Sequence, residues 1–248
     1  MNCQCSILVE DHFLNDLIQS IELTERKNLR EPSKKYKPSS MNCIRNMYFQ
    51  IIGQKVEDIG KTYSSIGIAE TGTDRHIRIQ AAVSAMRENG FDCDYLDVET
   101  YIKENNIEDI DIVRKNGAET LLYNKKYNIS FACDGIIKYK NEYYIIEFKT
   151  EGAYKFNKRI GVDESHINQA SAYSLSLKLN NVLFIYIDRD SLKMKAFMLS
   201  VTDTMRERII SKINTCDLYI ANGGIPPKEK SYKNCMYCQY KAYCESIK

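Results

Sequence analysis

The sequence lacks several features that would place it in a common class. Tryptophan is absent, and no apolar run approaches the roughly 18 to 20 residues that a membrane-spanning helix needs. The first residues, Met1 to Cys5, lack the basic region and apolar stretch of a signal peptide. Lysine and arginine number 35 against 33 aspartates and glutamates, a formal net charge of only +2. We therefore expect a cytoplasmic protein without a membrane partner, in which any nucleic-acid surface is a local basic patch.

The composition is otherwise that of a folded chain. Its 248 residues are 44% hydrophobic and 27% charged, close to the averages for globular proteins, which argues against disorder and against a fibrous repeat. This length fits one α/β domain or two small domains. The nine cysteines are an odd number in a chain without an export signal. A disulfide framework is therefore a poor explanation, and metal binding or reactive thiols are better ones.

Hydrophobic periodicity predicts a mixed α/β fold. Apolar residues at helical spacing predict a first helix at 8–24 and a second one that begins after a cap at Ser39 or Ser40. Further helices are predicted from Thr73 or Asp74 to Gly90, at 163–180 and at 204–220. Three β-rich runs at 119–124, 128–140 and 142–150 predict a meander whose last two strands join at Asn141, and two further strands are expected at 181–189 and 193–201. The segment 91–116 is expected to hold a short helix and one or two edge strands. This order favours a mixed central sheet flanked by helices.

Three charged residues lie on the two strands joined at Asn141. Glu147 and Lys149 are two apart, so they share one face of their strand, and pairing of the strands would bring Asp134 alongside Glu147. Two such carboxylates suit a divalent cation, and an adjacent ammonium suits phosphodiester hydrolysis. The alternative is a salt bridge on a solvated hairpin. Apolar residues flank both acids, however, and this context predicts burial, where acids are rarely left unpaired.

An Asp-Gly on one strand and Glu-Phe-Lys-Thr at the end of the next resemble the core motif of the PD-(D/E)XK nucleases, in the RecB-like variant. Upstream, Gly72 and His76 resemble the family's G-x-x-x-H element, and downstream Gln169 and Tyr173 resemble its Q-x-x-x-Y element. The resemblance implies a restriction-endonuclease-like fold with His76, Asp134 and Glu147 as ligands of Mg²⁺ or Mn²⁺. It makes Lys149 catalytic and gives Gln169 and Tyr173 a role in positioning DNA or water. His166 shares the helix face of Gln169 and Tyr173 but has no family counterpart.

Four cysteines form a second pattern. Cys235, Cys238 and Cys244 have the spacing C-x2-C-x5-C, and Cys43 lies near the start of a predicted helix, in a Cys-x-Arg context. A single early cysteine with a C-terminal trio resembles the iron–sulfur nucleases, such as the CRISPR-associated adaptation exonucleases and the AddB nuclease domain. The resemblance implies a [4Fe–4S] cluster that joins the N- and C-terminal parts of the chain. Zinc, or free buried thiols, are the alternatives.

The stretch after Lys149 mixes basic and aromatic residues, which suits a single strand because cations pair with phosphates and rings stack on bases. A solvated loop is the alternative. The candidate DNA-binding residues are Tyr154, Lys155, Phe156, Lys158 and Arg159.

Taken together, the motifs predict one structural domain with three parts: an N-terminal helix and loop at 1–38, a nuclease core at 39–231 and a cysteine-rich cap at 232–248. The expected function is that of a metal-dependent DNA exonuclease acting on single strands or DNA ends. The expected process is CRISPR adaptation, recombination or repair, or phage DNA processing. The expected partners are DNA and proteins of CRISPR adaptation or recombination. The alternative is an inactive or zinc-stabilised module that binds DNA ends or serves as an adaptor.

Overall fold

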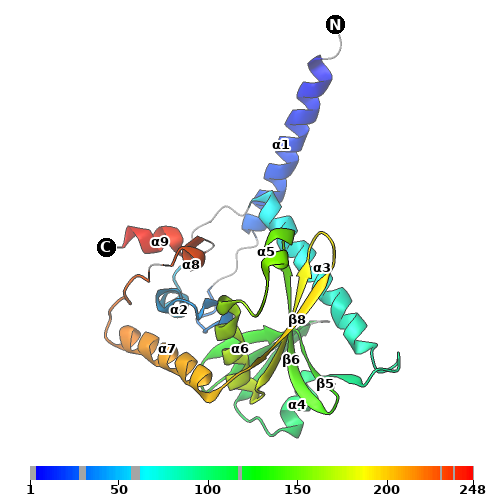
Figure 1. Cartoon of the computed structure of the whole chain (residues 1–248). Helices are drawn as coiled ribbons and strands as arrows, with labels where there is room; N and C mark the ends of the chain where they lie inside the picture. Colours follow the sequence, from blue (N-terminus) through cyan, green and yellow to red (C-terminus); the bar gives the residue numbers. More distant parts are fainter. Residues whose placement is uncertain are drawn as a thin grey trace.

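The computed structural model describes residues 4–27, 32–56, 62–116, 119–229, 231–236 and 238–247. Figure 1 shows a central sheet with helices on both sides. The helices are α1 (Gln4–Lys27), η1 (Pro38–Ser40), α2 (Ile44–Ile51), α3 (Tyr63–Ser84), α4 (Val98–Glu104), α5 (Ala153–Lys158), α6 (Glu164–Leu177), α7 (Asp203–Ala221), α8 (Tyr232–Met236) and α9 (Lys241–Ser246). The strands are β1 (Cys93–Leu96), β2 (Ile110–Asn116), β3 (Glu119–Asn124), β4 (Ile129–Cys133), β5 (Gly135–Tyr139), β6 (Glu142–Glu151), β7 (Asn181–Asp188) and β8 (Met194–Ser200).

The strands form two sheets. The larger has the order β1-β5-β6-β7-β8, and the smaller has the order β2-β3-β4. In the larger sheet β6 and β7 are parallel, whereas every other neighbouring pair is antiparallel. A parallel pair needs a crossover connection, and α6 lies within the segment that joins β6 to β7. The predicted mixed sheet with flanking helices is therefore confirmed.

The hairpin of β5 and β6 is confirmed at the predicted turn. Lys140 and Asn141 both have positive φ, 49° and 66°, as a two-residue turn of type I′ requires. Strand β6 then alternates between two packed faces. Ile146 and Phe148 belong to one apolar cluster, whose partly buried members include Ile79 of α3, and Ile145 belongs to another that includes residues of α6 and α7. Glu147 and Lys149 share the second face because they alternate with Ile146 and Phe148.

The predicted meander is wrong at Asp134. The run 128–140 is not one strand: β4 pairs with β3 in the smaller sheet, and β5 pairs with β1 and β6 in the larger one. The break follows from the backbone of Gly135, whose φ of +155° other residues rarely adopt. Asp134 therefore lies where the chain passes from one sheet to the other.

Two helix starts also differ from the sequence prediction. Helix α3 begins at Tyr63, before the predicted start at Thr73 or Asp74, and is capped by the Thr62 side chain, so it includes Gly67 and Gly72. Gly72 is buried there and faces Thr150 of β6, so packing on the sheet outweighs the low helix propensity of glycine. Ser39 and Ser40 lie in η1, and Cys43 is the N-cap residue of α2.

The first helix and the last two helices have different surroundings. Figure 1 shows α1 extending away from the body, whereas α8 and α9 lie beside α2. Helix α1 is anchored near its C-terminal end, where the Tyr63 N–H donates to Glu22. Among the described residues no helix is long and apolar enough to cross a membrane.

We expect Gly135→Ala to lower the free energy of unfolding by about 1–3 kcal/mol, the usual range for a strained backbone position. A Cβ at Gly135 would lie 2.5 Å from Cε2 of Tyr95, in addition to the unfavourable φ. Gly67→Ala is the control, since a Cβ in that helical position has no atom within 4 Å. Urea titrations followed by circular dichroism measure both variants, and equal stability of Gly135→Ala and the wild type would contradict the strain argument.

Candidate active site

Asp134 is held in place through its side chain and its backbone. Its Oδ2 accepts a hydrogen bond of 2.6 Å from the backbone N–H of Phe148 in β6. Its backbone carbonyl accepts from Gln80 of α3 at 2.6 Å and from the Tyr95 hydroxyl at 2.8 Å. No sequence pattern points to Gln80 or Tyr95, because each acts through the position of a neighbour. The buried carboxyl group of Asp134 is therefore fixed beside the middle of β6.

Glu147 and Lys149 contact each other on the face of β6 that α6 covers. Lys149 Nζ lies 2.5 Å from Glu147 Oε1, and Gln169 Nε2 of α6 lies 2.8 Å from the same oxygen. Gln169 Nε2 is also 2.6 Å from the hydroxyl oxygen of Tyr173, which in turn donates to the Ala132 carbonyl at 2.9 Å. The four motif residues thus form one connected group.

His76 reaches the site from α3, on the other side of the sheet. Its Nδ1 lies 3.3 Å from Asp134 Oδ1, and its ring packs edge-on against Phe148 with centroids 5.8 Å apart. Burial lowers the pKa of His76, but the hydrogen bond and charge of Asp134 outweigh it, so the net pKa is raised. The Asp134 carboxylate therefore favours a proton, or another cation, at the imidazole.

Glu147 is the most perturbed acid of the site. Burial raises its pKa to about 7, Lys149 opposes the shift and the charge of Asp134 adds to it. Its Oε2 is buried and has no hydrogen-bond partner among the described residues. An ionised carboxylate oxygen without a partner is costly to bury. The site therefore has unused capacity to bind a proton or a cation at this atom.

The donor set is chemically suited to a hard divalent cation. Carboxylate oxygens and an imidazole nitrogen are ligands that Mg²⁺ and Mn²⁺ accept, and the orphaned Glu147 Oε2 is an available one. The described residues nevertheless contain no group of three or more His, Cys, Asp or Glu side chains gathered closely enough to hold one ion. The structure brings His76 onto Asp134 and Lys149 onto Glu147, as two adjacent contacts.

The expected DNA-binding stretch is mainly a short helix, α5, and two of its candidates face inward. Phe156 is only 2% exposed, and Arg159 is buried in an ion pair with Glu151. Because of this burial neither side chain is presented to a DNA strand, which corrects their prediction as DNA-binding residues. Lys155 pairs with Glu151 and Asp163, whereas Lys158 donates to the hydroxyl of Tyr154, which is 75% exposed.

A cleft of about 720 Å³ lies beside this region. It is lined by the start of α6, by α7 and by α8. Its cationic side chains are Lys155, Arg208, Lys212 and Lys233. Arg208 and Lys233 have no hydrogen-bond or ion-pair partner within the described ranges. The sequence did not single out this cleft, since its cations come from three separate segments.

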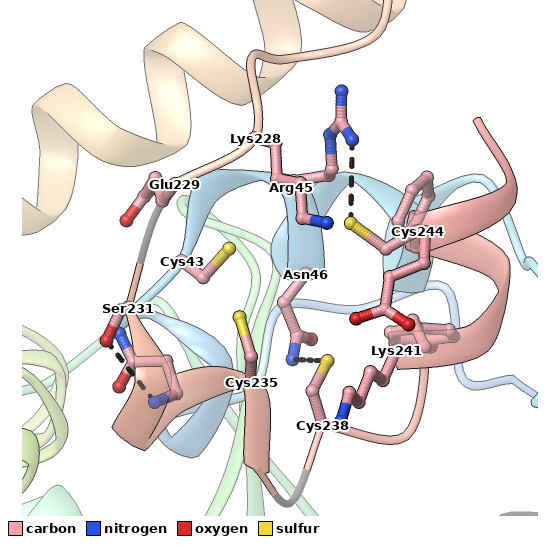
Figure 2. A pocket seen from close by; sticks show the side chains of 14 residues that line it. Cys43, Arg45, Asn46, Lys228, Glu229, Ser231, Cys235, Cys238, Lys241 and Cys244 are labelled. Atoms are coloured by element: carbon pink, nitrogen blue, oxygen red, sulfur yellow. Dashed lines mark hydrogen bonds between the residues drawn. The ribbon is translucent and has the colours of Figure 1, made fainter. Parts of the chain in front are cut away.

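The four motif cysteines line one pocket. Figure 2 shows Cys43 from the start of α2 facing Cys235, Cys238 and Cys244 from the C-terminal segment. Asn46 Nδ2 lies 3.4 Å from the Cys238 sulfur, and a guanidinium nitrogen of Arg45 lies 3.5 Å from the Cys244 sulfur. Burial raises the pKa of Cys43 and of Cys238. The pocket therefore joins residues some 190 positions apart in the chain.

No family model and no curated protein matches the sequence. Among solved structures the chain is similar to the protein SSO0001, at 15% identity and a TM-score of 0.52, over 94% of this chain and 96% of that one. This likeness shows a shared fold. An alkaline exonuclease from Laribacter hongkongensis, LHK-Exo, matches at 11% identity over 77% of this chain and 90% of its own, with a TM-score of 0.41. The structure of LHK-Exo in complex with dAMP matches at 11% identity over 77% of this chain and 89% of its own, with a TM-score of 0.46.

We expect Mn²⁺ to stabilise the protein more at pH 8 than at pH 5.5. The pKa of Glu147 is raised on folding, so between about pH 4.5 and 7 the folded state binds more protons than the unfolded chain. In this window stability falls as the pH rises, and above it the ionised Glu147 is available to a cation. At 100 times its dissociation constant, Mn²⁺ should add about 2.7 kcal/mol.

Urea unfolding at both pH values, with and without Mn²⁺, measures this effect. Glu147→Gln should remove most of it, and Glu142→Gln, at the exposed start of the same strand, is the matched control. An equal gain at both pH values, or a full gain in Glu147→Gln, would refute the assignment.

Proposed function

We propose that this chain is a metal-dependent nuclease that hydrolyses phosphodiester bonds in DNA, of the RecB-like PD-(D/E)XK type. One observation carries the proposal: Glu147 is a buried acid with an oxygen that has no partner in the described part of the chain, and it lies next to a lysine and beside a second buried acid, Asp134. A surface salt bridge of a hairpin would be exposed and fully paired. A buried acid with a raised pKa, here Glu147, gathered with a lysine and a histidine, is typical of catalytic sites.

His76, Asp134 and Glu147 lie in two adjacent contacts and would have to draw together to hold the cation, Mg²⁺ or Mn²⁺. When bound, such an ion polarises a phosphate and makes a bound water more acidic. Lys149 would orient the attacking water or stabilise negative charge on the phosphate. Gln169 fixes the Glu147 carboxylate, and Tyr173 fixes Gln169, so both position the reacting groups.

We further propose that the DNA strand approaches along the cleft beside α6. Arg208 and Lys233 line it without described partners, and Lys155 connects it to α5 near the site. Cations in a cleft, with no partner in the described ranges, suit the phosphates of a single strand better than the buried Arg159 does. Tyr154 remains an exposed ring on which a base can stack.

Two variants should separate chemistry from binding. Lys149→Ala should lower kcat by about 10²–10³-fold while the affinity for single-stranded DNA stays nearly unchanged, because stabilisation of the transition state is lost. Arg208→Glu combined with Lys233→Glu should show the reverse, with weaker binding and an unchanged saturated rate. Each lost phosphate contact should reduce the log-log salt slope by roughly 0.7.

Cleavage of end-labelled single strands with Mg²⁺ or Mn²⁺ gives the rates, and fluorescence anisotropy over a salt series gives the affinities. Lys103→Ala, an exposed lysine of α4, is the control. A Lys149→Ala protein with the wild-type rate would overturn the catalytic role. DNA binding without cleavage by the wild type would favour a non-catalytic end-binding module.

We also propose that Cys43, Cys235, Cys238 and Cys244 hold a [4Fe–4S] cluster. The pocket they line supports this, as do the N–H groups of Arg45 and Asn46 near two of the sulfurs, which would stabilise thiolates. A cluster places each thiolate on a different iron and needs a wider ring of sulfurs than one zinc ion does. Its role would be structural, since it ties the start of α2 to the C-terminal helices.

The protein purified without oxygen should therefore absorb near 400 nm and contain iron. Cys235→Ser should lose the band and have a lower free energy of unfolding, because binding energy at such a centre is also folding energy. Cys93→Ala, in the apolar cluster on the α3 side of the sheet, should keep the band. A colourless protein that contains one zinc ion would refute the cluster and indicate a zinc site in its place.

A further inference from the structure

His166 lies one helical turn before Gln169 on α6 and is not used by the proposed chemistry. Its ring stacks on two aromatic side chains of β7: the centroid distance is 6.0 Å to Phe184 and 5.8 Å to Tyr186, with interplanar angles of 15° and 22°. These contacts hold the imidazole plane nearly parallel to the two aromatic rings. The position of the ring is therefore set by packing on the strand and not by solvent.

The strand register places this imidazole beside the candidate active site. In the parallel pair β6 and β7, Glu147 is opposite Phe184 and Lys149 is opposite Tyr186. Paired residues of neighbouring strands project to the same face, so His166 covers the two positions next to Glu147 and Lys149. Gln169, which lies on the same face of α6, already contacts Glu147.

The hydrogen bonds determine which ring nitrogen carries the proton. The Tyr186 hydroxyl accepts a bond of 3.1 Å from the backbone N–H of Asp163 and lies 2.9 Å from His166 Nδ1. Tyr186 is fully buried, and its hydroxyl hydrogen has no other acceptor among the described residues. Donation to Nδ1 satisfies this hydrogen, and we therefore assign the imidazole proton to Nε2. Within the described part of the chain Nε2 has no partner, and the side chain is partly exposed.

The same surroundings keep the ring neutral. Burial lowers the pKa of His166 to about 4, and the charge of Lys149 lowers it further, as do Lys155 and Arg159, whereas Asp163 opposes them. At neutral pH the group is thus a neutral donor of fixed tautomer. Unlike a lysine, it does not compete with a cation for the carboxylates.

We infer that His166 binds DNA directly, by donating its Nε2–H to a phosphate oxygen of the strand held beside Lys149, with Tyr186 as the residue that fixes its tautomer. This inference rests on the proposed function. The ammonium of Lys149 supplies charge, whereas the imidazole supplies a directed hydrogen bond from a rigid ring. Such a bond to an anionic oxygen orients the phosphate.

Nitrogen NMR of the histidines tests the tautomer. The chain has only three, so His166→Gln identifies the signal by its loss. The wild type should show the proton on Nε2 from pH 5 to 8, and Tyr186→Phe should give a mixture of tautomers. A single-stranded oligonucleotide, added to saturation in Ca²⁺ as judged by anisotropy, should move the Nε2–H resonance. A proton on Nδ1, or a resonance that saturating DNA leaves unmoved, overturns the inference.

Kinetics provide the second readout. His166→Ala should lower kcat about 10- to 100-fold, the usual effect of losing a hydrogen bond to a charged group. His166→Gln, whose amide can place a donor near the Nε2 position, should recover most of the rate, and a purely structural role would not give this rescue. If the wild type binds DNA and moves the His166 resonance but does not cut, the nuclease proposal fails and this inference stands. If the wild type binds no oligonucleotide, both fail.

Discussion

The hydrogen bond between the Asp134 carboxylate and the Phe148 N–H is the contact on which the site depends. Asp134 lies at the passage between the two sheets, and this bond ties that passage to the middle of β6. It also brings a negative charge next to Glu147, whose own burial already disfavours ionisation. The two sheets, the raised pKa and the unpartnered oxygen are therefore linked. Gln80 and Tyr95 also restrain Asp134, because both donate hydrogen bonds to its backbone carbonyl.

The N- and C-terminal parts are joined by more than the cysteine pocket. Arg45 donates to the carbonyl of Pro226 at 2.7 Å, and Lys212 donates to that of Met41 at 2.9 Å. Asn42 bonds to residues of both α6 and α8. These polar contacts orient the start of α2 so that Cys43 faces the C-terminal trio. A cluster, if bound, would strengthen an existing junction by loop closure, on the order of 5 kcal/mol.

The sequence predicted those features that depend on neighbours in the chain. The hairpin, its register and the shared face of Glu147 and Lys149 follow from alternation around Asn141. The break at Asp134 was missed because the apolar run continues through Gly135, and the φ that ends the strand leaves no mark except a glycine. Phe156 was predicted at the surface because it lies among basic residues in the sequence. The short helix α5 buries its ring, and composition alone does not show which side chain of such a helix faces inward.

The early start of α3 was missed for a related reason. Gly67 and Gly72 indicate a loop by propensity, and only the close approach of Gly72 to Thr150 explains a helix there. The contacts of His166 were also hidden, because Phe184 and Tyr186 read as ordinary core residues of a strand. Long-range pairing is the information that a single sequence does not display.

The parallel pairing of β6 and β7 has a consequence for folding. The crossover between these strands contains α5 and α6. The segment from Asp134 to Tyr173 therefore carries β5, β6, α5 and most of α6 within one short stretch of chain. Contacts close in sequence have a low loop-closure cost and tend to form early. Most of the site would then be assembled by a local unit, whereas His76 and the cysteines join it through distant contacts. In native-state hydrogen exchange, amides of β6 and α6 should therefore open together, as one cooperative unit, separately from those of α2.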